Sequence, residues 1–141
     1  MQAEDFGCLQ DLPKVGNSYY TNVNGHLEET LAVARDPKGK TFPVGTVVQF
    51  FPGEAMVKRG KGFSEETNDW EYLILKSHKG ETYIEDRGTT EIKNLVGTCN
   101  SCHIEVQEFD NICSDVHGCI KLPFFARAIA ERDVRVDSRC Q

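Results

Sequence analysis

The sequence predicts a mainly β (α+β) protein, an antiparallel sheet with a few flanking helices. Three observations support this prediction. The middle third of the chain holds four short segments that are rich in β-branched and aromatic residues. The connections between these segments are shorter than the crossover helices that join parallel strands. Two further segments, one on each side of the middle third, place apolar residues at helical spacing.

The four expected strands span residues 46–51, 54–59, 70–76 and 81–86. Pro52-Gly53 separates the first two, and this pair suits a tight turn. Lys79-Gly80 precedes the fourth strand and is the second turn signal. Before the first strand, residues 15–26 (VGNSYYTNVNGH) are rich in turn-forming residues, so we expect irregular structure there.

The first expected helix covers residues 26–35 (HLEETLAVAR), because its leucines and alanines recur at helical spacing. Asn24 or Gly25 is positioned to cap its start, and residues 36–40 (DPKGK) end it. A second helix begins at Pro123, a residue favoured at the first helical position. Its expected apolar face is formed by Phe124, Ala128 and Ile129.

Composition indicates one domain over residues 1–141 and excludes several functions. The net charge of −6 argues against a nucleic-acid-binding protein, which usually presents a basic face. No apolar run reaches the roughly 18 residues of a membrane span. The N-terminal segment MQAEDFGCLQDLP has neither a basic start nor an apolar stretch, so it is not itself a signal peptide. We expect an exported protein whose signal lies outside this numbering.

The segment GTCNSCH, residues 97–103, contains two cysteines separated by two residues and followed at once by a histidine. Three chemistries use this spacing. A zinc site needs four ligands, and the nearest further donors, Cys113, His117 and Cys119, form no regular second pair. A thioredoxin-like dithiol belongs to a βαβ unit, which the strand pattern does not offer.

Covalent attachment of a haem is the third chemistry, and it accounts for all three residues. Two thiols add to the two vinyl groups of one porphyrin, which fixes the distance between Cys99 and Cys102. The adjacent imidazole of His103 then binds the iron from below the ring. We therefore expect a haem c held by Cys99 and Cys102, with His103 as the metal ligand. The residues 89–103 are expected to form a short helix or loop that presents this motif.

Four other cysteines, Cys8, Cys113, Cys119 and Cys140, permit two disulfides in three pairings. Cys113 with Cys119 closes a short loop, and Cys8 with Cys140 ties the ends of the chain together; we favour disulfides here. Ligation of the iron by one of these cysteines is the alternative. Disulfides are stable in an oxidising compartment, which agrees with export.

The motifs around the CxxCH, in order, are FPVGTVVQFF, EAMVKRGKGF, NDWEYLIL, CNSCH and FDNIC, between Phe42 and Cys113. This order and spacing resembles the cytochrome P-460 family, which includes the cytochromes c′-beta. The family has a typical Asp seven residues after the haem histidine, and Asp110 stands at that distance from His103. The resemblance covers about half of the chain.

The resemblance implies a mostly antiparallel β fold with one haem c, a periplasmic location, and a homodimer or a dimer with a related subunit. Members of the c′-beta branch typically bind nitric oxide or carbon monoxide, and single-electron transfer to a redox partner protein is the related role. P-460 enzymes instead oxidise hydroxylamine and carry a lysine cross-linked to the haem. Phe50 stands where that lysine belongs, and Lys58 matches a different family position. Hydroxylamine oxidation is therefore the alternative function, and whether the protein is an enzyme stays open.

Four residues of the expected strands are candidates for the wall of the haem pocket: Phe50, Glu54, Met56 and Trp70. Each also has a plainer interpretation. Phe50 and Trp70 suit a hydrophobic core, Glu54 suits a solvent-facing strand position, and Met56 suits packing as well as iron ligation. The remaining histidines, His26, His78 and His117, lie outside any ligand spacing and are expected at the surface or in turns.

Overall fold

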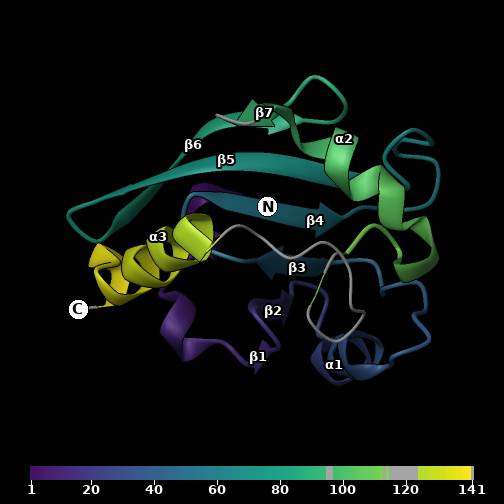
Figure 1. Cartoon of the computed structure of the whole chain (residues 1–141), viewed down its shortest axis with the longest axis horizontal. Helices are drawn as coiled ribbons and strands as arrows, with labels where there is room; N and C mark the ends of the chain where they lie inside the picture. Colours follow the sequence, from purple (N-terminus) through teal and green to yellow (C-terminus); the bar gives the residue numbers. More distant parts are fainter. Residues whose placement is uncertain (95–96, 113, 115–123, 141) are drawn as a thin grey trace.

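The computed structural model describes residues 1–94, 97–112, 114 and 124–140. Its centre is a six-stranded antiparallel sheet in which every strand pairs with its neighbours in sequence, in the order β1-β2-β3-β4-β5-β6 (Figure 1). The strands are β1 Lys14–Val15, β2 Ser18–Asn22, β3 Thr46–Gln49, β4 Glu54–Lys58, β5 Trp70–His78 and β6 Glu81–Gly88. This α+β fold confirms the predicted antiparallel sheet.

The other elements flank the sheet. The α-helices of the described residues are α1 Leu27–Arg35, α2 Cys99–His103 and α3 Phe124–Arg135. A small second sheet pairs β7 Lys93–Asn94 with β8 Gly97–Thr98, and 3-10 helices cover Ala3–Asp5, Leu9–Asp11, Ile104–Phe109 and Ser138–Cys140. None of the helices in this described part is long and apolar enough to be a transmembrane segment.

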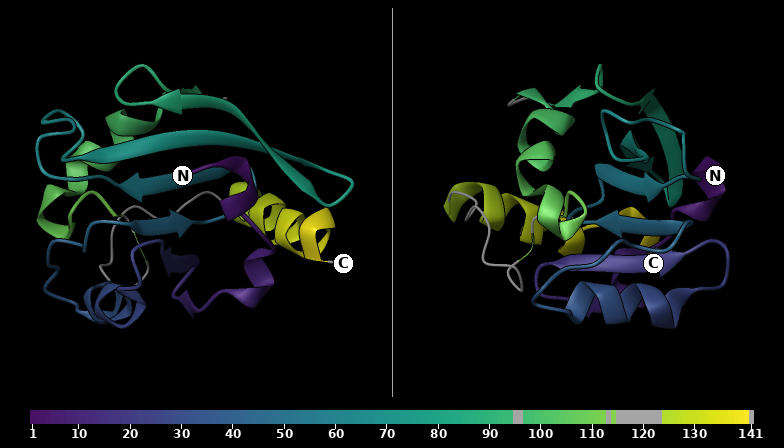
Figure 2. Two further views of the ribbon diagram at one scale, coloured as in Figure 1. Left: turned by 180° about the vertical axis from the view of Figure 1, so that it is seen from behind. Right: turned by 90° about the vertical axis from the view of Figure 1, so that its right-hand side faces the viewer.

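The two faces of the sheet carry separate hydrophobic cores, because side chains alternate along a strand. Met56 pairs with Tyr72 across β4 and β5, and both contribute to one core together with Trp70 and Cys99. The next residues along the strands contribute to the other core, whose members are Phe6, Val47, Ala55, Val57, Leu73 and Leu75. Seen from the side, α2 lies on one side of the sheet and the N-terminal segment on the other (Figure 2).

The four predicted strands are present with modest changes at their ends. β3 ends at Gln49, two residues before the predicted end, and β5 and β6 each continue two residues further than predicted. The turn at Lys79-Gly80 is confirmed. Both of its residues have positive φ, 51° and 86°, as the tightest antiparallel hairpins require.

The expectation of irregular structure over residues 15–26 is wrong. β2 occupies Ser18–Asn22 and pairs with β3 through Tyr20 and Val48. Two tertiary contacts stabilise this strand. Tyr20 is fully buried, and Nδ2 of Asn22, a turn-forming residue, donates to the Thr30 hydroxyl at 3.1 Å. Tertiary contacts thus outweigh local propensity in this strand.

The helix predicted over residues 26–35 is confirmed as α1, but its predicted cap is wrong. The N-cap residue is His26, not Asn24 or Gly25, and no side chain caps the helix there. Asn24 serves the preceding turn instead, since its N–H donates to Oδ1 of Asn22 at 2.8 Å. His26 is exposed and approaches Glu29, so its expected surface position is confirmed, as it is for His78.

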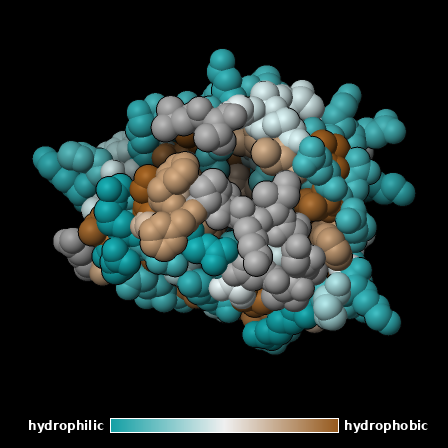
Figure 3. Space-filling model, in the orientation of Figure 1, coloured by the Kyte–Doolittle hydropathy of each residue, from teal (hydrophilic) through white to brown (hydrophobic). Residues whose placement is uncertain are grey.

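The C-terminal helix is present as α3, while Pro123, its predicted first residue, lies outside the described residues. The predicted apolar face does not face the core. Phe124 is 87% exposed and Ile129 is 47% exposed, whereas Ala130 and Val134 are buried. Apolar side chains accordingly gather on the surface over the start of α3 (Figure 3). The buried face of the helix is therefore formed by Ala130 and Val134.

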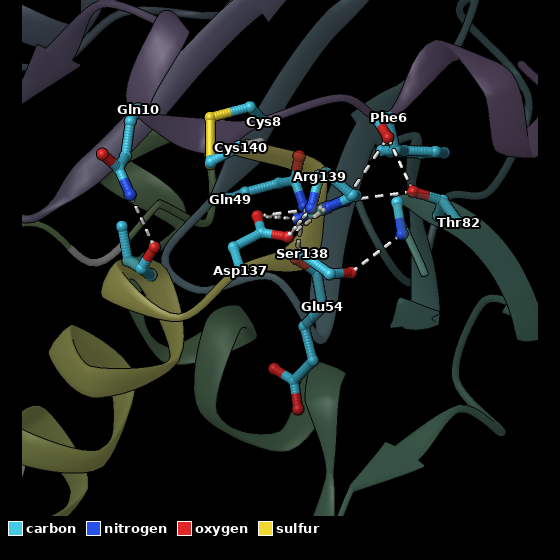
Figure 4. A network of polar contacts seen from close by, with 12 residues as sticks. Phe6, Cys8, Gln10, Gln49, Glu54, Thr82, Asp137, Ser138, Arg139 and Cys140 are labelled. Atoms are coloured by element: carbon cyan, nitrogen blue, oxygen red, sulfur yellow. Dashed lines mark hydrogen bonds and ion pairs between the residues drawn. A yellow bond between two sulfur atoms is a disulfide. The ribbon is translucent and has the colours of Figure 1, made fainter. Parts of the chain in front are cut away.

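The two ends of the chain are joined. Cys8 and Cys140 form a disulfide, which confirms one of the two favoured pairs. Beside it, Arg139 and Asp137 form a buried ion pair at 2.8 Å, with side-chain exposures of 2% and 0%. Arg139 also donates to the Thr82 hydroxyl at 3.2 Å, which attaches the C-terminus to β6 (Figure 4). Cys113 and Cys119, the other favoured pair, lie outside the described residues.

Candidate functional site

Helix α2 contains the whole CNSCH motif. It follows β8 directly, and the N–H of Cys99 donates to the carbonyl of Ile92 at 3.0 Å. Ile92 is 1% exposed, so this bond ties the start of the helix to the core. Residues three and four positions apart share one face of a helix. The two thiols and the imidazole of His103 are therefore presented together.

The two cysteines of α2 have different surroundings. Cys99 is buried in the core on the α2 side of the sheet, and Cys102 is exposed. Neither is in a disulfide. Burial raises the pKa of the Cys99 thiol to about 11, and the negative charge of Glu54 adds to this rise. The sulfur of Cys99 is thus a thiol at neutral pH, and neither sulfur is committed to a disulfide bond.

His103 is oriented by a backbone group. Its Nδ1 atom lies 2.7 Å from the carbonyl oxygen of Asn111. A carbonyl can only accept, so Nδ1 carries the proton and Nε2 has the free lone pair. Burial lowers the pKa of His103, which favours the neutral imidazole. Within the described part of the chain, Nε2 has no hydrogen-bond partner. Metal-binding histidines typically have this arrangement.

Tyr72 of β5 packs against the same imidazole. The two ring centroids are 5.6 Å apart, and the rings are tilted by 42°. The Tyr72 hydroxyl donates to Oδ1 of Asn100 at 2.9 Å, and Nδ2 of Asn100 donates to the Glu66 carbonyl at 3.1 Å. Burial raises the pKa of Tyr72, so the phenol stays a donor. Tyr72 therefore connects the sheet to the middle of α2.

Three of the four predicted wall residues lie on the sheet face that α2 covers. Met56 and Trp70 belong to the same core as Cys99, with exposures of 7% and 0%. Glu54 is half-buried, and its Oε1 accepts from Nδ2 of Asn94 at 2.9 Å. Burial raises the pKa of Glu54. Its side chain points away from the Asp137–Arg139 pair (Figure 4).

Phe50, the fourth predicted wall residue, lies apart from the other three. It follows the end of β3, is half-buried, and packs edge-on against Phe51 with ring centroids 6.2 Å apart. A shallow hollow between the β1–β2 hairpin and α3 has Phe50 in its lining, with Tyr19 and Val134. The structure thus brings Glu54, Met56 and Trp70 to the neighbourhood of Cys99 but does not bring Phe50 there.

Sequence reasoning missed Tyr72 and Asn111 as residues of this site. Tyr72 lies within the strand predicted over residues 70–76, and its contact with His103 depends on how α2 folds over the sheet. Asn111 had a usable signal, because Asp-Asn pairs tolerate the left-handed backbone conformation of a tight turn. The φ angles of Asp110 and Asn111 are 52° and 63°. This turn brings the Asn111 carbonyl back to His103.

The donor set at α2 fits a haem c and offers no complete zinc site. Two free thiols and an imidazole held through one nitrogen are the groups that haem attachment requires. Among the described residues, no three His, Cys, Asp or Glu side chains form a group that can hold a metal ion. Cys113, His117 and Cys119 lie outside those residues. The described strands pair only antiparallel, unlike a thioredoxin-type βαβ unit.

Comparison of this chain with protein-family models, with curated proteins and with solved structures finds no match.

Proposed function

We propose that this protein is a mono-haem c-type cytochrome, with the haem joined to Cys99 and Cys102 and its iron bound by His103. One observation carries the proposal: the CxxCH motif occupies a single short helix, with both thiols free and Nε2 of the imidazole unpartnered within the described residues. A haem supplies an iron that transfers single electrons and binds small diatomic gases. Binding of nitric oxide or carbon monoxide, or electron transfer to a redox partner protein, is therefore the proposed role.

Residues of the chain have distinct parts in this proposal. The carbonyl of Asn111 holds the imidazole in the tautomer that leaves Nε2 available. Tyr72 packs on the same ring and limits its rotation. Met56 and Trp70 provide an apolar surface that excludes water from the sheet side. Glu54 has a raised pKa beside Cys99, so it can hold a proton near the site.

The oxidation of hydroxylamine remains the alternative, and the structure offers it little support. It requires a lysine bonded to the porphyrin, and Phe50 stands at the position where the family resemblance puts that lysine. Lys58, a lysine of the neighbouring strand β4, is buried, and its Nζ lies 2.7 Å from Oδ1 of Asp110. A strongly red-shifted Soret band, or a haem peptide with a third covalent link, would favour the enzyme.

We further propose a periplasmic location and a dimer, identical or with a related subunit. The disulfide between Cys8 and Cys140 is consistent with an oxidising compartment. Haem attachment to a CxxCH motif takes place after export, where the thiols are kept reduced for the reaction. Fractionation of the source cells tests the location, and light scattering of the purified protein tests the oligomeric state.

The decisive experiment is expression with haem-maturation machinery, followed by absorption spectroscopy and mass spectrometry. We expect a coloured protein that carries one haem mass, gives the pyridine spectrum of haem c, and changes its spectrum when carbon monoxide is added to the reduced form. Cys99→Ala with Cys102→Ala should be colourless after denaturing chromatography. The matched control, Cys8→Ser with Cys140→Ser, removes two other cysteines and should keep the haem. Colourless matured wild type with two free thiols in α2 contradicts the proposal.

A further inference from the structure

A buried ion pair lies behind the turn that orients His103. Nζ of Lys58 is 2.7 Å from Oδ1 of Asp110, and the side chains are 6% and 2% exposed. Lysine and aspartate are almost never this deeply buried unless they are paired. The same ammonium donates to the carbonyl of Asn68 at 2.7 Å and lies 5.2 Å from the centre of the Trp70 ring. The ammonium group of Lys58 therefore has its polar and aromatic partners inside the protein.

Asp110 receives donors on both of its carboxylate oxygens. Besides Lys58, Nδ2 of Asn68 donates to Oδ1 at 2.7 Å, and the N–H of Phe42 donates to Oδ2 at 2.8 Å. Burial raises the pKa of Asp110, and the hydrogen bonds from Lys58 and Phe42 oppose that rise. The indole N–H of Trp70 donates to the backbone carbonyl of Asp110 at 2.8 Å. Residues from β4, β5 and two loops thus fix both the side chain and the backbone of Asp110.

This fixation matters because the backbone of the turn is unfavourable. Asp110 and Asn111 both have positive φ, a conformation that Asp and Asn tolerate better than other residues with a Cβ atom but that still needs surrounding contacts to hold two in succession. Nδ2 of Asn111 donates to the carbonyl of Thr67 at 3.2 Å and holds the second residue. The result is a carbonyl at Asn111 that points to Nδ1 of His103, 2.7 Å away.

We propose that Lys58 and Asp110 are positioning residues for His103. Their ion pair holds the left-handed turn at Asp110-Asn111, and this turn holds the carbonyl that selects the Nδ1–H tautomer of the imidazole. Neither side chain touches His103, so the effect acts through the backbone of the turn. The tautomer effect is a property of the chain itself, and its consequence for the iron rests on the proposed function.

Three variants test the proposal in the protein without haem. Lys58→Met removes the ammonium, Asp110→Asn removes the carboxylate charge, and the double variant avoids leaving an uncompensated buried charge. Long-range ¹H–¹⁵N spectra at about pH 8, where imidazole is neutral, report the tautomer of His103 directly. We expect wild type to show Nδ1–H, and the variants to shift the tautomer ratio toward Nε2–H by on the order of tenfold, as the loss of one hydrogen bond predicts.

Arg139→Met is the matched control, because it breaks an equally buried ion pair that lies in the C-terminal segment. It should destabilise the protein but leave the tautomer of His103 unchanged. An unchanged tautomer in the folded double variant overturns the proposal, even if the single variants unfold. The proposal is also overturned if Arg139→Met shifts the tautomer as much as the three variants do. A general loss of stability would then be the cause.

A second readout uses the haem-loaded protein. A weaker hydrogen bond at Nδ1 makes the imidazole a poorer electron donor, so the double variant, which leaves the net charge unchanged, should raise the reduction potential, and Arg139→Met should not. The experiments test the cytochrome proposal and the positioning role of Lys58 and Asp110 independently. A tautomer shift without any haem attachment rejects the cytochrome and keeps the positioning role. Haem attachment with an unchanged tautomer and potential keeps the cytochrome and rejects the positioning role.

Discussion

Cys8 and Cys140 are joined by a disulfide across a sequence separation of 132 residues. The bond connects the start of the N-terminal 3-10 helix Leu9–Asp11 with the last 3-10 helix, Ser138–Cys140. The N-terminal segment contributes Phe6 to the second core, and the C-terminal segment contacts β6 through Arg139. The disulfide therefore holds together the two segments that cover one end of the sheet.

Removal of this disulfide should be costly. We expect Cys8→Ser with Cys140→Ser to lower the free energy of unfolding by about 2–5 kcal/mol, because the cross-link restricts the unfolded chain over a very long loop. Trp70, the only tryptophan, is fully buried and reports unfolding in urea by fluorescence. Wild type treated with a reductant should match the variant. Equal urea midpoints for the oxidised wild type and the variant would contradict the expectation.

The buried pair of Arg139 and Asp137 provides the second prediction. Arg139→Met leaves the carboxylate of Asp137 buried without its partner, so we expect a loss of about 3–5 kcal/mol in the free energy of unfolding. Arg132→Met is the matched control, because Arg132 forms an exposed pair with Asp133. That change should cost less than about 1 kcal/mol. If urea unfolding gave similar losses of free energy for the two variants, the prediction would be wrong.

Glu71 predicts a dependence of stability on pH. Burial raises the pKa of Glu71, but hydrogen bonds from Arg87 and Arg59 outweigh burial and hold the pKa below its ordinary 4.5. A carboxyl with a lowered pKa in the folded state stabilises the fold above its unfolded pKa, and this stabilisation is lost as the pH falls through the folded-state pKa. Glu71→Gln should therefore lower the free energy of unfolding at about pH 7, by ~1–3 kcal/mol.

In acid, the free energy of unfolding of Glu71→Gln should approach that of wild type. Below about pH 4.5 the wild-type carboxyl also becomes neutral in the unfolded and then the folded state, so the difference shrinks. Urea unfolding at a series of pH values measures it. Glu28→Gln replaces an exposed residue of α1 and is the control. Its free energy of unfolding should follow that of wild type at every pH. A Glu71→Gln difference that stays constant from neutral pH into acid would be inconsistent with the ion-pair explanation.

The orientation of α3 gives the fourth prediction. Val134 is 8% exposed and Ile129 is 47% exposed on the same helix. Val134→Ala should cost about 1–2 kcal/mol, because it removes buried methyl groups. Ile129→Ala should change the free energy of unfolding by no more than about 0.5 kcal/mol in the protein without haem. Thermal unfolding of the two variants compares them, and a larger loss for Ile129→Ala would place the predicted face against the core after all.

The strands of the middle third could be predicted because their signal is local. Residues such as Val47, Val48 and Ile74 favour extended backbone wherever they occur, and Lys79-Gly80 adopts the turn that two adjacent strands need. β2 and the face of α3 could not be predicted in this way. Tyr20 lies in a strand because β3 pairs with it, and Phe124 is exposed because α3 buries the face that carries Ala130 and Val134 instead.

The sequence by itself determined the chemistry of the candidate site, since the spacing of Cys99, Cys102 and His103 puts two thiols and an imidazole on one turn of helix wherever that helix lies. Only the tertiary structure decided how the imidazole is held. The carbonyl of Asn111 reaches His103 through a turn that Lys58 secures from 52 residues away. Spacing along a helix is a local property, whereas a buried charge finds its partner only after strands and loops have packed together.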